Sequence, residues 1–206
     1  MLKVESDILL AIDAGDLSAL VLLDLSAAFD TVDHTILLRR LEHSYGLGGT
    51  VLRWFNTYLV GRRQHVRIGS TTSIPTIVLC GVPQGSVLGP ILFLLYTAEL
   101  VHLIESHGLC VHLYANDTQI YSFCQPSMSS DLQTRISACI NEVAAWMRSN
   151  RLQLINTAKT ELLWSATSRR LHQLPQLPLR VGSAPTKSHH PWSSVTSAFT
   201  LTLRFL

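Results

Sequence analysis

The sequence has few cysteines, none of them closely spaced, and few charged residues. Each of these absences makes a class of protein less expected. The four cysteines are at positions 80, 110, 124 and 139; no pair has metal-site spacing, and no histidine pair completes a zinc set. We therefore expect reduced, mostly buried thiols in an intracellular protein, with nothing to distinguish nucleus from cytoplasm. Charged residues make up 15% of the chain, and the net charge of +2 is too small to identify a partner.

Signal peptides and long apolar runs are also missing. Lys3, Glu5 and Asp7 interrupt the start of the chain, and no cleavage-site pattern follows. The longest apolar run, VLGPILFLLY from Val87 to Tyr96, contains a glycine and a proline. It is shorter than the roughly 20 residues that a membrane-spanning helix needs. We expect a buried helix there and no membrane partner, while the oligomeric state is left open.

Apolar residues, in contrast, are abundant at 47%, so the chain can bury a core. Ala19 to Leu25 is an apolar run with one aspartate, which predicts a buried strand ending near Asp24. Strand-forming segments on both sides of Asn116-Asp117 predict a hairpin, and others are expected at residues 66–68 and 76–79 around a GSTTS turn. Apolar spacing predicts helices over residues 1–15, 52–59, 86–103 and 131–147, and a further helix that Asp33 caps and Gly46 ends.

Together these elements predict an α/β fold of the α+β type, with a small antiparallel sheet packed on helices. Periodicity is lost after about Ser168, where four prolines precede a Ser/Thr-rich stretch. We therefore expect one domain over residues 1–168 and a poorly ordered tail over residues 169–206.

Two aspartates are the first candidates for chemistry. Asp24 ends the predicted strand and Asp117 lies at the tip of the predicted hairpin, where two carboxylates of a sheet can hold hard divalent cations. Two such ions can activate a hydroxyl and stabilise a leaving group in an in-line displacement. Spacing alone leaves two alternatives open, a helix cap and a turn residue.

Four strings in a fixed order carry a family resemblance. They are VLLDLSAAFDTVDH (21–34), GVPQGSVLGPILF (81–93), YANDTQIY (114–121) and WMRSNRLQLINTAKTELLW (146–164). They resemble motifs A, B, C and D of non-LTR retrotransposon reverse transcriptases, with the jockey-like elements of animals the most similar in character. The segment WFNTYLVGRRQHVRIG also resembles the linker hairpin of that family. The resemblance implies a polymerase palm that copies an RNA template from a DNA primer, using dNTPs and two Mg²⁺ ions.

The resemblance also implies roles for single residues at the reacting centre. Asp24, the carbonyl of Leu25 and Asp117 would bind the metal ions. Phe29 would lie beneath the sugar and exclude a 2′-hydroxyl, although the residue type alone fits an ordinary core aromatic. Gln84 would contact the incoming nucleotide or the template, and Gly85 would let the backbone approach it.

Three further side chains are assigned with alternatives. Lys159 matches the lysine proposed to protonate the pyrophosphate, and a solvated surface lysine fits the sequence as well. Asp30 and Asp33 are expected to be structural, as a hydrogen-bond partner and a helix cap.

Arginines cluster between the first two motifs, where they can neutralise backbone phosphates or simply form a solvated surface. The residues expected to bind nucleic acid are Arg62, Arg63 and Arg67, and the wider cluster adds Arg39, Arg40 and Arg53.

The sequence departs from the family pattern at Asn116, which replaces the metal-bridging aspartate. A neutral amide removes one negative charge beside two dications. Ile155 adds one residue to motif D and would change the aim of Lys159. The fingers and thumb subdomains that flank the palm in this family are expected to be largely missing. The residues after Ser183 do not resemble the family sequence, as a frameshift would produce. Apolar surface that the fingers would cover should be exposed, which predicts poor solubility.

Three hypotheses follow. The first is an RNA-directed DNA polymerase domain, predicted to be inactive in this copy. The second is a non-catalytic remnant that binds nucleic acid weakly. The third is a membrane or scaffold protein built on the apolar helix, against which Gly89 and Pro90 argue.

Overall fold

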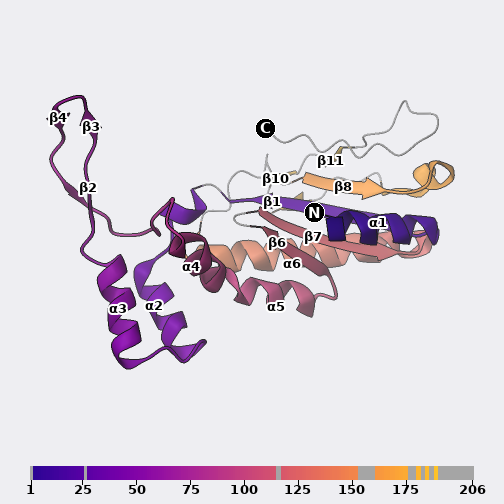
Figure 1. Ribbon diagram of the computed structural model, residues 1–206. Helices are drawn as coiled ribbons and strands as arrows, with labels where there is room; N and C mark the ends of the chain where they lie inside the picture. The colour runs from indigo at the N-terminus through magenta and orange to yellow at the C-terminus, as the bar shows by residue number, and fades with distance from the viewer. Residues whose placement is uncertain are drawn as a thin grey trace.

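A five-stranded sheet forms the central layer of the molecule (Figure 1). The computed structural model describes residues 2–25, 27–114, 117–152 and 161–175, and the backbone of residues 180–181, 184–185 and 188–189; at Asp24 it describes the backbone alone. The strand order is β11 (Ser188–His189), β8 (Glu161–Ser165), β1 (Leu17–Asp24), β7 (Asp117–Cys124) and β6 (Cys110–Tyr114). Neighbouring strands are antiparallel except β11 and β8, and β9 (Arg180–Val181) pairs with β10 (Ala184–Pro185) outside this sheet.

Helices cover both faces of the sheet (Figure 1). On one face lies α1 (Leu2–Asp13), and on the other lie α4 (Leu88–Thr97), α5 (Glu99–Ser106) and α6 (Ser129–Ser149). At one end α2 (His34–His43) packs against α3 (Gly49–Leu59) and α4. Three 3₁₀ turns complete the description: η1 (Ala28–Asp30), η2 (Pro126–Met128) and η3 (Ser168–Gln173). The α+β class expected from the sequence is confirmed.

The alternation of side chains along β1 divides the core into two clusters. Leu17, Ala19, Val21 and Leu23 face the main cluster, which contains the buried residues of α2 and α4 to α6. Leu20 faces the smaller cluster beneath α1, together with Val4, Ile8, Ile12 and Tyr121. Both faces of the strand are therefore buried, as the continuous apolar run predicted.

Local signals placed several helix ends correctly. The Asp33 side chain accepts a hydrogen bond from the Ile36 amide at 2.9 Å and caps α2. That helix ends at His43, and Gly46 adopts a positive φ of 66° just beyond it. The predicted helices over residues 1–15, 52–59 and 131–147 correspond to α1, α3 and α6, and the hairpin is formed by β6 and β7.

The apolar helix expected over residues 86–103 differs from the prediction. It begins at Leu88 and is divided at Ala98 into α4 and α5. By length and composition alone, the 19-residue stretch Leu88–Ser106 could cross a membrane, with a mean hydropathy of 1.5. This stretch joins α4 to α5 and is therefore longer than the run from Val87 to Tyr96 on which the sequence argument rested. Leu92, Phe93 and Tyr96 of this stretch are buried in the main cluster.

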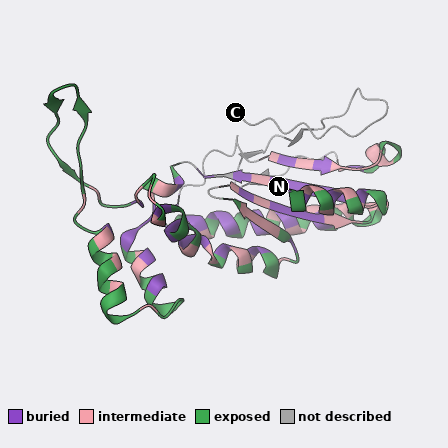
Figure 2. Ribbon diagram, in the orientation of Figure 1, coloured by how far each residue is buried: buried purple, intermediate pink, exposed green. Residues whose placement is uncertain are grey.

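Residues 60–79 form a protruding ribbon, which we call the arm (Figure 1). The arm contains two short ladders, β2 (Arg63–Gln64) with β5 (Thr76–Ile77) and β3 (Arg67–Ile68) with β4 (Thr71–Thr72). The two expected strands therefore pair with other partners instead of each other. No arm residue is buried, and Figure 2 shows the ribbon almost entirely as exposed.

Two other expectations need comment. Cys139 alone of the four free cysteines is buried, while Cys80 and Cys110 are exposed, so the expectation of mostly buried thiols is wrong. Within the expected tail, residues up to 175 include η3, and Leu174 belongs to the main cluster. Residues 190–206 lie outside the described part of the chain, so a poorly ordered tail stays a prediction there.

Candidate functional site

The end of β1 and the start of β7 bring the two candidate aspartates together. The register pairs Asp24 with Asp117 directly, after Leu23 with Thr118. Directly opposed residues of an antiparallel pair lie on the same face, with Cα atoms about 4.5 to 5.5 Å apart. Asp117 also pairs with Tyr114 across the hairpin. The sheet thus places two acidic positions side by side on neighbouring inner strands, at the end of the sheet nearest η1.

This pair lies beyond the part of the sheet that α1 covers. The α1 cluster packs on Leu20 and Tyr121, and the half-buried Leu22, two residues before Asp24, also packs against it. At about 3.3 Å per residue, Leu22 and Asp24 are roughly 7 Å apart along the strand. The α1 cluster therefore ends one side-chain position before the aspartate pair on this face.

Two loops distant in sequence are joined by hydrogen bonds beside this end of the sheet. The Val82 amide donates to the Phe29 carbonyl, and the Gly81 amide donates to the Val32 carbonyl, both at 2.7 Å. The buried His34 ring donates through Nε2 to the Gly81 carbonyl at 2.8 Å. These bonds fix residues 80–82 against residues 29–34.

Glycine is required where the loops meet. Gly81 has a φ of 92°, and a Cβ added there would lie 3.0 Å from backbone atoms of Phe29 and Asp30. A Cβ at Gly89 would lie 2.5 Å from the Pro83 carbonyl oxygen, closer than such contacts occur. Backbone packing therefore determines how the loop enters α4.

The candidate nucleotide-binding residues lie on these joined loops. The half-buried Phe29 ring packs 5.0 Å from the Phe93 ring, so it contributes to the core whatever else it does. The exposed Gln84 donates through Nε2 to Asp30 Oδ1 at 2.8 Å, which gives Asp30 the expected structural role. Gly85 has a φ of 76°, and a Cβ added there would have nothing within 4 Å. Glycine is therefore favoured here by the backbone conformation of the turn and not by close packing.

The segment that leads to Lys159 is anchored at its start. Arg151 adopts a positive φ of 55° and forms an ion pair with the Asp33 carboxylate, 2.5 Å from Nη1 to Oδ2. Asp33 is thus both the helix cap and the partner of this arginine. Asn116 and Lys159 themselves lie outside the described residues, and so does the side chain of Asp24.

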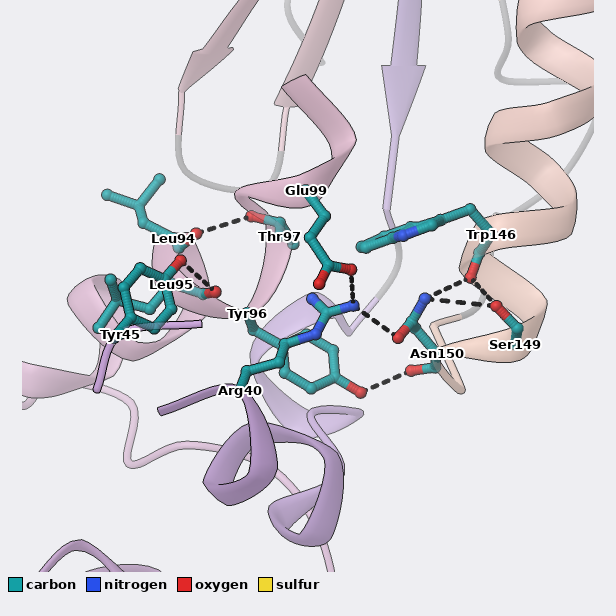
Figure 3. Close-up of polar contacts among 10 residues, drawn as sticks. All are labelled: Arg40, Tyr45, Leu94, Leu95, Tyr96, Thr97, Glu99, Trp146, Ser149 and Asn150. Carbon is teal, nitrogen blue, oxygen red and sulfur yellow. Dashed lines mark hydrogen bonds and ion pairs between the residues drawn. The ribbon is translucent and has the colours of Figure 1, made fainter. Parts of the chain in front are cut away.

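A buried arginine behind the site was missed from the sequence (Figure 3). The Arg40 guanidinium donates through Nη2 to Glu99 at 2.7 Å and to the Asn150 side chain at 2.8 Å. It lies about equally close to the Tyr96 and Trp146 rings, 5.1 and 5.0 Å from their centroids. Burial raises the pKa of the Tyr96 phenol, whose hydroxyl donates to the Asn150 carbonyl at 2.6 Å.

Arg40 is therefore not part of a phosphate-binding surface, and that interpretation was wrong. A signal was present in the sequence, because Arg40 lies three residues after the core residue Leu37 and next to the core residue Leu41. Arg63 and Arg67 are exposed on the arm and Arg62 is half-buried at its base.

No group of three or more His, Cys, Asp and Glu side chains suited to a metal ion occurs in the part of the chain that the structure describes. That part leaves out the carboxylate of Asp24 and the hairpin turn. The donors that the register does bring together are carboxylate positions, the ligand type that Mg²⁺ prefers.

The chain is similar to reverse transcriptases over most of its length. The family model described as "Reverse transcriptase (RNA-dependent DNA polymerase)" matches residues 9–183. A probable RNA-directed DNA polymerase from transposon BS of Drosophila melanogaster is 31% identical over 170 residues, which are 77% of this chain and 17% of that protein. The RNA-directed DNA polymerase from mobile element jockey of Drosophila funebris is 27% identical over 143 residues, 66% of this chain and 15% of that protein. The chain thus spans less than a fifth of either relative.

Among solved structures, apo telomerase from Candida tropicalis aligns with a TM-score of 0.57 and 13% identity. The alignment covers 81% of this chain and 34% of that chain. At this identity the likeness concerns the fold alone.

Proposed function

Since the chain belongs to the reverse transcriptase family, whose model matches residues 9–183, we propose that it forms the palm of an RNA-directed DNA polymerase that Asn116 has disabled. The observation that carries the proposal is the strand register that pairs Asp24 with Asp117. The substrates are an RNA template, a DNA primer and dNTPs. The Drosophila relatives are RNA-directed DNA polymerases of mobile elements, which supports these substrates.

Metal binding is assigned to the paired acidic positions. Enzymes of this family generally use divalent metal ions. Asp24, the Leu25 carbonyl and Asp117 would hold two Mg²⁺ ions. Bound Mg²⁺ would activate the primer hydroxyl and stabilise the pyrophosphate as it leaves. Asn116 would offer one neutral oxygen where the family pattern has a carboxylate, so the site would hold the ions less tightly and position them less well. Losing charge and geometry together costs orders of magnitude in rate.

The joined loops orient the nucleotide. The Phe29 ring packs against the Phe93 ring, and the bond from the Val82 amide to the Phe29 carbonyl fixes the backbone that carries it. A ring positioned in this way can exclude a 2′-hydroxyl by contact. Gln84 and Gly85 lie on the exposed end of the second loop and are proposed to contact the nucleotide or the template. Lys159 is proposed to donate a proton to the pyrophosphate or to stabilise its charge.

The alternative is a non-catalytic remnant that binds nucleic acid weakly. The arm is compatible with it, because Arg63 and Arg67 are exposed and Arg62 is half-exposed on a ribbon that contributes nothing buried to the core. Contact between these arginines and phosphates belongs to both proposals, so the arm does not distinguish them.

Primer extension on an RNA template separates the two readings. We expect the wild-type chain to extend a primer poorly with Mg²⁺ or Mn²⁺, and Asn116→Asp to increase extension by orders of magnitude. Asp24→Asn in the Asn116→Asp background is the inactive control. Efficient extension by the wild type would show that Asn116 is not disabling.

Metal binding provides an independent measurement if no variant extends a primer. Electron paramagnetic resonance titration with Mn²⁺ should show tighter binding to Asn116→Asp than to the wild type. Asp24→Asn should weaken binding in both backgrounds. Equal Mn²⁺ affinity in all these variants would exclude the paired aspartates as the metal site.

A further inference from the structure

The surface formed by α3 and the arm carries positive charge without any acidic residue. No aspartate or glutamate occurs between Glu42 and Glu99, a range that contains all of α3 and the arm. Arg53 is exposed on α3, Arg63 and Arg67 are exposed on the arm, and Arg62 is half-exposed between them. Figure 2 shows most residues of α3 and of the arm as exposed, with Leu59 buried between them. Such a surface is complementary to a polyanion.

An aromatic pair is fixed on the same surface. Trp54 is 52% exposed although it is the largest side chain of α3. Its ring stacks on Tyr58, with centroids 5.3 Å apart and planes 8° apart, and meets Phe55 edge-on at 5.1 Å. The Tyr58 hydroxyl donates to Ser86 Oγ at 3.2 Å, which ties the stack to the loop before α4. The indole is therefore held in place while half of its surface is open to solvent.

We infer that α3 and the base of the arm bind single-stranded nucleic acid, with Trp54 stacking on an unpaired base and Arg53, Arg62 and Arg63 contacting its phosphates. A pre-ordered aromatic ring flanked by cations is the arrangement that tracks single strands without reading sequence. Duplex bases are already stacked on each other and do not offer their faces to an indole. The inference extends the proposed function by adding a binding surface outside the reacting centre.

A protein partner is the competing occupant, because the arm also exposes aliphatic residues, among them Val66, Ile68, Ile74, Ile77 and Leu79. Val66, Ile68 and Ile74 lie further along the ribbon than Arg62, whereas Ile77 pairs with Arg63 at its base, next to the proposed binding surface. The absence of acidic residues across the whole surface favours a polyanion over a second copy of this chain, whose arm would carry the same charge.

Fluorescence anisotropy with a labelled mixed-sequence single strand and the matching duplex tests the inference, in EDTA and without nucleotides. We expect tighter binding of the single strand. Trp54→Leu should weaken single-strand binding roughly 5- to 100-fold and leave duplex binding little changed. Trp54→Phe, which keeps a ring, should restore part of the loss. Arg53→Gln and Arg63→Gln should each reduce the slope of log affinity against log salt by about 0.7.

Arg169→Gln is the matched control, because Arg169 is exposed on η3, outside this surface, and should leave the slope unchanged. Equal affinity for single strand and duplex, with no effect of Trp54→Leu, would overturn the inference. A dimer that light scattering shows to be lost in Ile77→Ser, together with single-strand binding that Trp54→Leu does not weaken, would assign the surface to a second copy of the chain instead. Neither metal nor catalysis enters this assay, so an inactive Asn116→Asp variant leaves its outcome unaffected.

Discussion

At the scale of single residues, Arg40 joins three parts of the fold at one guanidinium (Figure 3). Its side chain is 8% exposed, and its Nη1 is buried without a partner among the described residues. Burying a charge that is incompletely paired is costly, and the two flanking rings offset part of this cost. Removing Arg40 costs most at Asn150, whose buried side-chain oxygen would lose its hydrogen-bond donor. Glu99 is about half exposed, so water can replace the arginine there.

We predict that Arg40→Ala lowers the free energy of unfolding by about 3 to 5 kcal/mol, as expected when one partner of a buried polar cluster is removed. Glu99→Ala should cost less than about 1 kcal/mol, because this carboxylate remains about half exposed and surface ion pairs contribute little. Urea denaturation followed by circular dichroism measures both variants. Equal losses would show that the ion pair, rather than the buried hydrogen bond and ring contacts, stabilises the cluster.

Gly89 gives a prediction in which the usual sign is reversed. Replacing a helical glycine by alanine normally stabilises a protein by up to about 1 kcal/mol. At Gly89 the new Cβ would meet the Pro83 carbonyl, so we expect Gly89→Ala to destabilise by about 1 to 3 kcal/mol. Gly48→Ala, at the N-cap of α3, is a control for a glycine replacement that meets no neighbour, because a Cβ there has nothing within 4 Å. A stabilising Gly89→Ala in thermal denaturation would mean that the loop is not held against α4.

At the scale of elements, the contact between α1 and the sheet depends on a tyrosine. Tyr121 on β7 is 3% exposed and donates its hydroxyl to Asp7 of α1 at 2.8 Å. Burial, and then the bond to Asp7, raises the pKa of Tyr121 far above its ordinary value of 10.0. The fold therefore favours the neutral phenol, and the unfolded chain ionises first. The stability this provides is fully present below pH 10 and is lost as the pH rises above it.

We accordingly predict that stability falls with rising pH above about 10 and that Tyr121→Phe reduces the steepness of this fall. A residual dependence should remain, because burial also raises the pKa of Tyr96. Tyr114→Phe is the control, since Tyr114 is 70% exposed. Urea midpoints measured from pH 8 upward test the prediction. An unchanged slope in Tyr121→Phe would show that the Asp7 contact does not stabilise α1.

The elements also show which features a sequence can predict. The α2 cap at Asp33 was predictable because a cap depends on residues within one turn. The spacing of Arg40 from Leu37 indicated a position towards the core, but its hydrogen-bond partners were not predictable, because Glu99 of α5 and Asn150 are distant in sequence. Pairing within the arm was missed because the polar GSTTS segment itself supplies β4. A continuous apolar run predicted β1, and strand-forming segments predicted the hairpin. Spacing gave only weak support for placing Asp24 beside Asp117, and the family resemblance supplied the rest.

At the scale of the whole molecule, burial is distributed very unevenly. The sheet and its helices contain both core clusters, whereas the arm has two ladders of two residue pairs each and nothing buried. Elements with few buried contacts open at low free energy, independently of global unfolding. The arm can therefore fluctuate while the aspartate positions, held by β1 and β7 in the centre of the sheet, remain in register.

Hydrogen exchange measured by mass spectrometry should follow this division. We expect peptides from β1, β7 and α6 to exchange slowest and peptides from the arm to exchange orders of magnitude faster. Adding a single-stranded oligonucleotide should slow exchange at the base of the arm, where the Val78 amide donates to the Arg62 carbonyl at 2.9 Å. Exchange in β1 should not change, because that strand is already protected and does not contact the surface of α3. If the arm were as protected from exchange as β1 in the free protein, contacts from outside the arm would have to stabilise its ladders. Self-association through its exposed aliphatic residues would then explain the protection better than a free arm does.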